Sequence, residues 1–182
     1  VLPNLLHLDK KEDIDNAEFE GFLYAELYLT EKLNSRTKFN EKYIKQIHKI
    51  ALKDLYGFAG LYRTVNMSKG GFLFPTAQFI PQSMTAYDNE ILSLLPNTYE
   101  SEKSLISDVA KVHGELLFIH PFREGNGRTA RILANLMVRK QGYKGLHFDR
   151  IDDEIFVQYV NAVQMVAEKN YGPMEEVIKL VF

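Results

Sequence analysis

The stretch His120-Pro-Phe-Arg-Glu-Gly-Asn-Gly-Arg-Thr-Ala-Arg131 combines a base, a carboxylate, a glycine-flanked turn and two arginines. Because Gly125 and Gly127 lack Cβ, the backbone around Asn126 can turn sharply and aim successive N–H groups at an anion. The helix expected to follow adds the positive end of its dipole. Arg128 and Arg131 are three positions apart, a spacing that on a helix places both guanidinium groups on one face. The mixture suits a nucleoside triphosphate.

Helical periodicity surrounds this stretch on both sides. The apolar spacing predicts a helix from about Ser104 that stops before Pro121, and another from Gly127 to Gly142. Four more helices are predicted to begin at Asp13 or Asp15, at Asn40, near Pro81 and at Asp152, and a last one has Pro173 in its first turn. In the first of these, the expected buried face consists of Phe19, Phe22, Leu23 and Leu27.

The segment from Val65 to Phe74 has a different character. Two short runs flank a Lys69-Gly70-Gly71 turn, which is typical of a β-hairpin. The prediction is therefore a mainly α-helical bundle with one short hairpin. No linker or repeat divides the chain, so we expect a single globular unit, in which an N-terminal helical segment, residues 1–38, packs on a domain of residues 39–182.

Composition limits the classes of protein to consider. The chain has 182 residues, 46% of them hydrophobic, without a run of about eighteen apolar residues or a basic N-terminal region, so neither a membrane span nor a secretion signal is expected. It has no cysteine, which excludes disulfides and thiol nucleophiles and is compatible with a cytoplasmic protein. A net charge of −2 without a dense basic block argues against a nucleic-acid partner.

The central stretch lacks the P-loop, dinucleotide-binding and zinc-protease patterns. It resembles the signature of the Fic family, H-P-F-x-[DE]-G-N-G-R-x-x-R, at every specified position. The resemblance extends upstream through Leu55-Tyr-Gly-Phe-Ala-Gly-Leu-Tyr-Arg-Thr64 and Ser68-Lys-Gly-Gly71, and covers roughly residues 39–170. It implies a Fic-like helical bundle whose hairpin is a flap, with residues 39–182 as the catalytic domain.

The resemblance also implies roles for the residues of the motif. His120 would be the general base that activates a target hydroxyl, and Glu124 would bind Mg²⁺. The phosphates of ATP would be held by Gly125, Asn126, Gly127, Arg128 and Arg131. Phe122 would be a core anchor without a catalytic role. His113, His48 and His7 are interpreted as histidines without a role in the chemistry.

Two further sites follow from the same resemblance. Lys69 and Gly70 would lie at the tip of the flap, near nucleotide and target, and the flap edge would align the target by backbone pairing. An ordinary hairpin that covers the core is the alternative, and both readings are compatible. Tyr159 would contribute to the pocket for the nucleotide base, although a tyrosine in this register also suits a core position.

Regulation in many Fic proteins involves a helix with the pattern [ST]-x-x-x-E-[GN]. The nearest string here is Asn16-Ala-Glu-Phe-Glu20-Gly21, in which Asn replaces Ser or Thr. Glu20 would then be an inhibitory residue. The alternative, which the sequence favours, is that the helix is scaffold with Glu20 in solvent. An antitoxin-like partner or a homo-oligomer remain other routes to regulation.

The resemblance implies a protein adenylyltransferase that moves AMP from ATP and Mg²⁺ to a Tyr, Thr or Ser hydroxyl of a target protein, releasing pyrophosphate. Transfer of another nucleotide or phosphate-containing group is one alternative, because the loop recognises phosphates rather than the base. A low-turnover nucleotide-binding module of a toxin–antitoxin pair is another, and the presence of His120 and Glu124 argues against it.

Overall fold

The structure, a computed structural model, describes all 182 residues and is dominated by seven α-helices. Their bounds are α1 Lys11–Lys32, α2 Glu41–Leu52, α3 Ile80–Glu90, α4 Glu102–Ile119, α5 Asn126–Lys140, α6 Asp153–Met165 and α7 Gly172–Val181. Single 3₁₀ turns lie at Ala77–Phe79, Leu92–Leu94, Phe148–Arg150 and Val166–Glu168. The fold class is the predicted one, a helical bundle with one hairpin.

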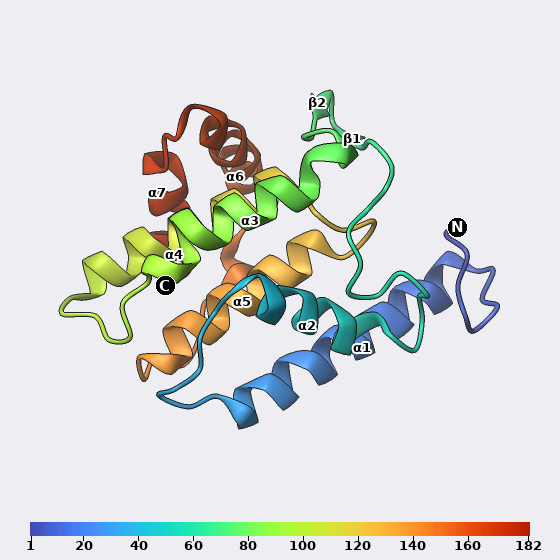
Figure 1. Cartoon of the computed structure of the whole chain (residues 1–182), viewed down its shortest axis with the longest axis horizontal. Helices are drawn as coiled ribbons and strands as arrows, with labels where there is room; N and C mark the ends of the chain where they lie inside the picture. Colours follow the sequence, from blue (N-terminus) through green and yellow to red (C-terminus); the bar gives the residue numbers. More distant parts are fainter.

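Helices α4 and α5 form the centre of the bundle (Figure 1). Helix α5 contacts α1 and α2 on one side, whereas α4 contacts α3, α6 and α7. Both central helices are buried over most of their length, and one apolar core runs through the whole molecule. The loop between them, residues 120–125, therefore lies where the two groups of helices meet. None of the helices combines the length and apolarity that crossing a membrane needs.

Several helix ends form where local chemistry predicts them. The side chain of Asn40 accepts a hydrogen bond from the N–H of Tyr43, and that of Asp152 accepts one from Ile155, so both are N-caps. Pro173 lies in the first turn of α7. The cap of α4 is Ser101, three residues before the predicted start. Helix α2, predicted to begin at Asn40, runs from Glu41 to Leu52.

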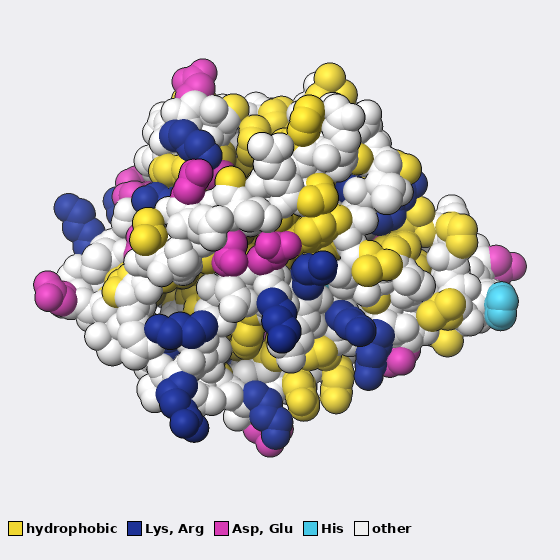
Figure 2. Space-filling model, in the orientation of Figure 1, with side chains coloured by type: hydrophobic (Ala, Val, Ile, Leu, Met, Phe, Trp, Pro, Cys, Tyr) yellow, Lys and Arg dark blue, Asp and Glu magenta, His cyan; other side chains and the backbone are white.

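Helix α1 differs from its prediction in both its start and its buried face. It begins at Lys11 after an N-cap residue, Lys10, that makes no side-chain cap, so neither Asp13 nor Asp15 caps it. Of the predicted face only Phe22 is buried, whereas Phe19, Leu23 and Leu27 are exposed. The buried residues of α1 are Ile14, Glu18, Phe22, Ala25 and Leu29. Figure 2 shows apolar side chains at the surface in the region that α1 and α2 occupy.

A close approach to α2 explains why α1 buries this face. A Cβ atom on Gly21 would lie 1.9 Å from the carbonyl oxygen of Ala51, so only glycine allows the two backbones to come together there. The small side chain of Ala25 is also fully buried on this side. Close packing of these small residues against α2 therefore orients α1, rather than the spacing of its largest apolar residues.

The predicted hairpin is present as two short antiparallel strands, β1 Ser68–Lys69 and β2 Phe72–Leu73. Gly70 and Gly71 connect them, and both have positive φ angles, 57° and 81°. The hairpin lies apart from α1 and α2, at the edge of the bundle next to α3 and α6 (Figure 1).

Candidate active site

The loop begins with an unusual backbone at His120. Helix α4 ends at Ile119, and His120 adopts a left-handed conformation with φ 53° and ψ 58°. The following Pro121 disfavours a right-handed helical conformation at His120 and ends the helix. Few residues other than glycine adopt positive φ, so this conformation has a conformational cost that other contacts must offset.

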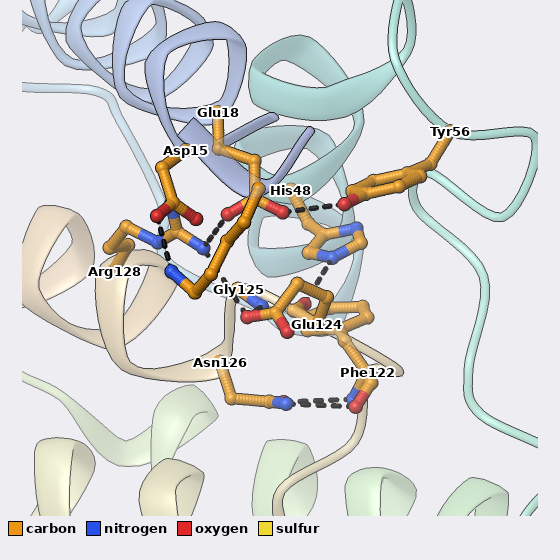
Figure 3. Close-up of polar contacts among 10 residues, drawn as sticks. Asp15, Glu18, His48, Tyr56, Phe122, Glu124, Gly125, Asn126 and Arg128 are labelled. Carbon is orange, nitrogen blue, oxygen red and sulfur yellow. Dashed lines mark hydrogen bonds and ion pairs between the residues drawn. The ribbon is translucent and has the colours of Figure 1, made fainter. Parts of the chain in front are cut away.

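Asn126 closes the loop through its side chain (Figure 3). Its Oδ1 accepts a hydrogen bond from the N–H of Phe122, its Nδ2 donates to the carbonyl of Phe122, and both distances are 2.8 Å. Asn126 is buried, so this amide is committed to the loop rather than free for phosphate, a role that the sequence prediction did not give it. Gly125 has φ 77°, and a Cβ there would meet the ring of Phe22 at 2.7 Å.

His48 holds the loop in place through a hydrogen bond and a stacking contact. The N–H of Gly60 donates to its Nδ1 at 2.8 Å, so its Nε2 carries the proton and donates to the carbonyl of Glu124 at 2.9 Å. Its ring stacks on the fully buried ring of Phe122, with 3.9 Å between the centroids. Burial lowers the pKa of His48 to about 4, which keeps the imidazole neutral. The predicted core position of Phe122 is confirmed.

His120 has its second ring nitrogen available for chemistry. Its Nδ1 lies 3.2 Å from the carbonyl of Leu117, to which it can only donate, so Nε2 is the unprotonated nitrogen. The ring of Phe74, next to strand β2, stacks on the imidazole at 3.8 Å. Burial is the main cause that lowers the pKa of His120 to about 4, and the charges of Arg63 and Lys69 contribute. A neutral imidazole with a free Nε2 can accept a proton.

His120 faces a cavity of about 350 Å³ between the hairpin, the start of α5 and helix α6. The structure brings six of the predicted site residues together here, and the cavity also has a largely apolar wall. Its lining residues are Lys69, Gly70, Phe72, Phe74, Leu117, His120, Gly127, Arg131, Phe156, Tyr159, Val160, Val163 and Gln164.

Arg131 and Tyr159 both line this cavity. The guanidinium of Arg131 lies 5.3 Å from the ring centroid of Phe148, and its buried Nε has no hydrogen-bond partner. The hydroxyl of Tyr159 lies 2.6 Å from Nε2 of His113, whose Nδ1 lies 3.1 Å from the carbonyl of Ala130. His113 is thus a fully buried, hydrogen-bonded histidine that supports Tyr159, and burial lowers its pKa to about 4.

Arg128 and Glu124 lie elsewhere, which differs from the expectation that the two arginines share one face. Nη2 of Arg128 contacts Oε2 of Glu18 at 2.5 Å and Oε1 of Glu124 at 3.3 Å, and both carboxylates line a second cavity beside α1 (Figure 3). The guanidinium also lies 4.6 Å from the centroid of Phe22. Helix α1 therefore surrounds Arg128 on two sides, while Arg131 points into the cavity of His120.

The acidic residue of α1 that contacts the motif is Glu18, not Glu20. Glu18 is buried and accepts a hydrogen bond of 2.6 Å from the hydroxyl of Tyr56, whereas the side chain of Glu20 is exposed. A sequence signal for Glu18 existed, because it shares the i, i+4 row of Ile14 and Phe22. The pattern of residues 16–21 had indicated Glu20 as the carboxylate for this contact, which differs from the structure.

Glu124 is suited to magnesium by its chemistry. Mg²⁺ is commonly held by one or two carboxylates together with substrate phosphates, so one hard oxygen ligand on this loop is sufficient. The side chain of Glu124 is partly exposed, and its Oε1 accepts from the N–H of Gly125 at 2.8 Å. No group of three or more potential metal-binding side chains exists in the structure. The donor set therefore fits an ion bound together with a phosphate, and not a metal site made by protein alone.

Sequence reasoning missed three residues that organise the site: Arg63, His48 and Phe74. Arg63 is buried and donates to backbone carbonyls of the hairpin and of the end of α4. His48 and Arg63 come from segments distant in sequence from the loop they contact. No periodicity or spacing could have indicated those contacts.

Comparison with known proteins agrees with this geometry. A sequence model described as the Fic/DOC family matches residues 38–138. The chain is 28% identical over 139 residues to protein adenylyltransferase Fic of Nematostella vectensis, covering 76% of this chain and 30% of that protein. It is also 28% identical over 158 residues to protein adenylyltransferase VbhT of Bartonella schoenbuchensis, covering 84% and 31%. The chain thus spans about three tenths of the length of these curated relatives.

Solved structures share the whole fold. The N-terminal Fic domain of Bep8 from a Bartonella species superposes with a TM-score of 0.80 at 18% identity, covering 100% of this chain and 90% of that one. BepC of Bartonella tribocorum, solved with bound AMPPNP, gives 0.81 at 17% identity, covering 100% and 91%. Because the family model spans more than half of the 182 residues and includes the entire stretch from His120 to Arg131, the chain belongs to the Fic/DOC family.

Proposed function

We propose that this chain is a protein adenylyltransferase domain that transfers AMP from ATP to a hydroxyl of a target protein. The observation that carries the proposal is the free Nε2 of His120 in a cavity that also contains the cations Lys69 and Arg131. A base beside a cationic cavity suits attack by a hydroxyl on a phosphate. The names of the curated relatives and the AMPPNP bound to BepC support ATP as the nucleotide.

In the proposed reaction, Nε2 of His120 takes the proton of a Tyr, Thr or Ser hydroxyl as its oxygen attacks the α-phosphorus of ATP. The bond between the α-phosphorus and the bridging oxygen breaks, and pyrophosphate leaves with that electron pair. Arg131 and the N-terminal amides of α5 stabilise the negative charge on the phosphates. The low pKa of His120 keeps its imidazole neutral and ready to accept the proton.

Glu124 would hold Mg²⁺, which when bound neutralises charge on the phosphates. Arg128 is predicted to contact the leaving phosphates, and its pairing with Glu18 implies an exchange of partners for that contact. The hairpin edge is the proposed docking site of the target. A cytoplasmic location and an antitoxin-like or homo-oligomeric inhibitor stay predictions, as does the division at residue 38.

Labelled ATP provides the test. The purified chain with Mg²⁺ and candidate target protein is incubated in parallel with ATP labelled at the α-phosphate and at the γ-phosphate. Adenylyl transfer leaves the α-label, and not the γ-label, on protein. Retention of the γ-label would instead indicate phosphate transfer, and nucleotide binding with neither label transferred would indicate the low-turnover module. Replacing ATP by the other nucleoside triphosphates in the same assay determines the base preference.

A further inference from the structure

Arg63 is a buried cation whose hydrogen-bond partners are all backbone carbonyls. It is 3% exposed. Its Nε donates to His120 at 2.7 Å, its Nη1 to Val65 at 2.8 Å and its Nη2 to Pro75 at 2.6 Å. A fourth and longer contact, 3.5 Å, joins Nη2 to the carbonyl of Ile119. No carboxylate pairs with it, so these carbonyls alone offset the cost of burying its charge.

These carbonyls belong to two parts of the molecule. Val65 and Pro75 lie on either side of the hairpin, so the guanidinium bridges its two ends. Ile119 and His120 lie at the C-terminus of α4, where unpaired carbonyls carry the negative end of the helix dipole. The backbone N–H of Arg63 also donates to the carbonyl of Pro121 at 2.8 Å. One side chain thus joins the base of the hairpin to the histidine and its neighbours.

The geometry at His120 gives these bonds a specific consequence. The left-handed conformation of His120 needs support, and the bond from Nε of Arg63 holds its carbonyl. The hairpin segment also contacts His120 directly, because Phe74 stacks on the imidazole. Phe74 is followed by Pro75, whose carbonyl Arg63 binds. The planar fork of one guanidinium therefore connects both ends of the hairpin to the backbone of His120.

We infer that Arg63 is a positioning residue that sets the hairpin, on which a target would dock, at a fixed distance and orientation from His120. Its side chain is buried and does not line the cavity of His120. The inference rests on the proposed function for its catalytic meaning, but the geometry that it claims can be measured without activity. Small displacements of reacting groups are costly, because a misplacement of about 1 Å can lower a rate by about 10²-fold.

Two substitutions separate the fork of Arg63 from its charge. Arg63→Lys keeps a cation but cannot bind both ends of the hairpin and α4 in one plane, whereas Arg63→Gln removes the charge as well. Hydrogen–deuterium exchange of residues 65–75 reports the attachment of the hairpin. We expect exchange there to accelerate by about 10-fold or more in both variants, as for loss of local protection.

The titration of His120, followed by NMR, reports the charge. The charged groups that face His120 are Arg63, Lys69 of the hairpin and Arg131 of α5. Because Arg63 lowers the pKa of His120, its removal in Arg63→Gln should raise the midpoint by about half a pH unit or more, and Arg63→Lys should raise it less. The resonance is assigned by its loss in His120→Asn.

Asn135→Ala is the matched control. Asn135 is also buried and binds backbone, accepting from the N–H of Leu146 at 2.8 Å, but it lies outside the cavity of His120. It should lower thermal stability while leaving hairpin exchange and the His120 midpoint at parent values. Parent-like values of both readouts in the two Arg63 variants would overturn the inference, as would equal changes in Asn135→Ala.

Activity is a separate readout. If the parent transfers the α-label, both Arg63 variants should transfer it about 10-fold or more slowly, with affinity for an ATP analogue within about 3-fold of the parent. A loss of analogue affinity that equals the loss of transfer would overturn the positioning role. If the parent transfers no label, the proposed function fails while exchange and titration still decide the role of Arg63.

Discussion

At the scale of the single residue, the backbone of His120 limits which side chains can replace it. A left-handed conformation is tolerated by asparagine better than by other side chains with a Cβ atom, and worst by β-branched ones. His120→Asn therefore removes the proposed base with less strain than other substitutions. It separates loss of chemistry from loss of the loop.

We expect His120→Asn to lower AMP transfer by about 10²–10⁴-fold, the usual contribution of a general base. Binding of an ATP analogue should remain, because the cations of the cavity are unchanged. Label transfer and analogue titration measure the two effects. His147→Asn is the control, since the His147 side chain is half-exposed and lies outside the cavity. Transfer at the parent rate by His120→Asn would contradict the assignment of the base.

At the scale of the element, Glu18 and Glu20 of helix α1 are two residues apart but lie in opposite environments, one buried and one exposed. Glu18→Gln leaves Arg128 without its closest carboxylate, so we expect unfolding free energy to fall by about 1–3 kcal/mol. Glu20→Gln changes an exposed side chain and should stay within about 0.5 kcal/mol. Thermal or denaturant unfolding compares them directly. Equal stabilities would show that the buried ion pair contributes nothing.

The inhibitory hypothesis for Glu20 has its own test in the same helix. Glu20→Gly should cost roughly 1 kcal/mol as a glycine in a helix interior. If Glu20 is scaffold, label transfer per folded molecule stays at the parent level. A large rise in transfer at unchanged stability would instead place an inhibitory role in α1.

Elements whose ends depend on local chemistry could be predicted from the sequence. The Asn40 and Asp152 caps, the Gly70-Gly71 turn and the stop at Pro121 need only their neighbours in the chain. The buried face of α1 could not be predicted, because it depends on Gly21 meeting the backbone of α2. The spacing of large apolar residues favours the face with Phe19, which is exposed.

The site divides in the same way. The motif indicated the loop, and the structure gathers His120, Arg131, Lys69 and Tyr159 around one cavity. The supporting contacts come from distant segments, such as Glu18, which lies 110 residues from Arg128. The sequence also could not show that the amide of Asn126 closes its own loop, because the motif reads the same whether this asparagine binds the loop backbone or a ligand.

At the scale of the whole molecule, buried histidines make stability sensitive to acid. Burial lowers the pKa of His48 and of His113 from 6.5 to about 4 in the folded state. The unfolded chain therefore binds protons first, so stability is complete above about pH 6.5 and is lost as pH falls toward 4. Proton binding at each of these two histidines should lower the free energy of unfolding by about 2 kcal/mol at about pH 5.

Thermal unfolding between about pH 7 and pH 4.5 measures this loss. His48→Gln and His113→Gln should lower stability at neutral pH, because each removes part of a hydrogen-bonded pair, but should flatten the decline at acid pH. The exposed His147 provides the control, and His147→Gln should retain the full decline. A parent chain equally stable at both pH values would show that these histidines titrate normally.

The contact at Gly21 makes the N-terminal helix adjustable by a single methyl group. Gly21→Ala would wedge α1 away from Ala51, and because Glu18 and Phe22 flank this point, the displacement would reach Arg128 and Gly125. The gain in helix propensity, about 1 kcal/mol, opposes the clash, so a fall in melting temperature would show that the clash dominates. Because Gly21 has a hydrogen atom where other residues have Cβ, α1 can form the outer wall of the loop at residues 120–125, about a hundred residues later in the chain.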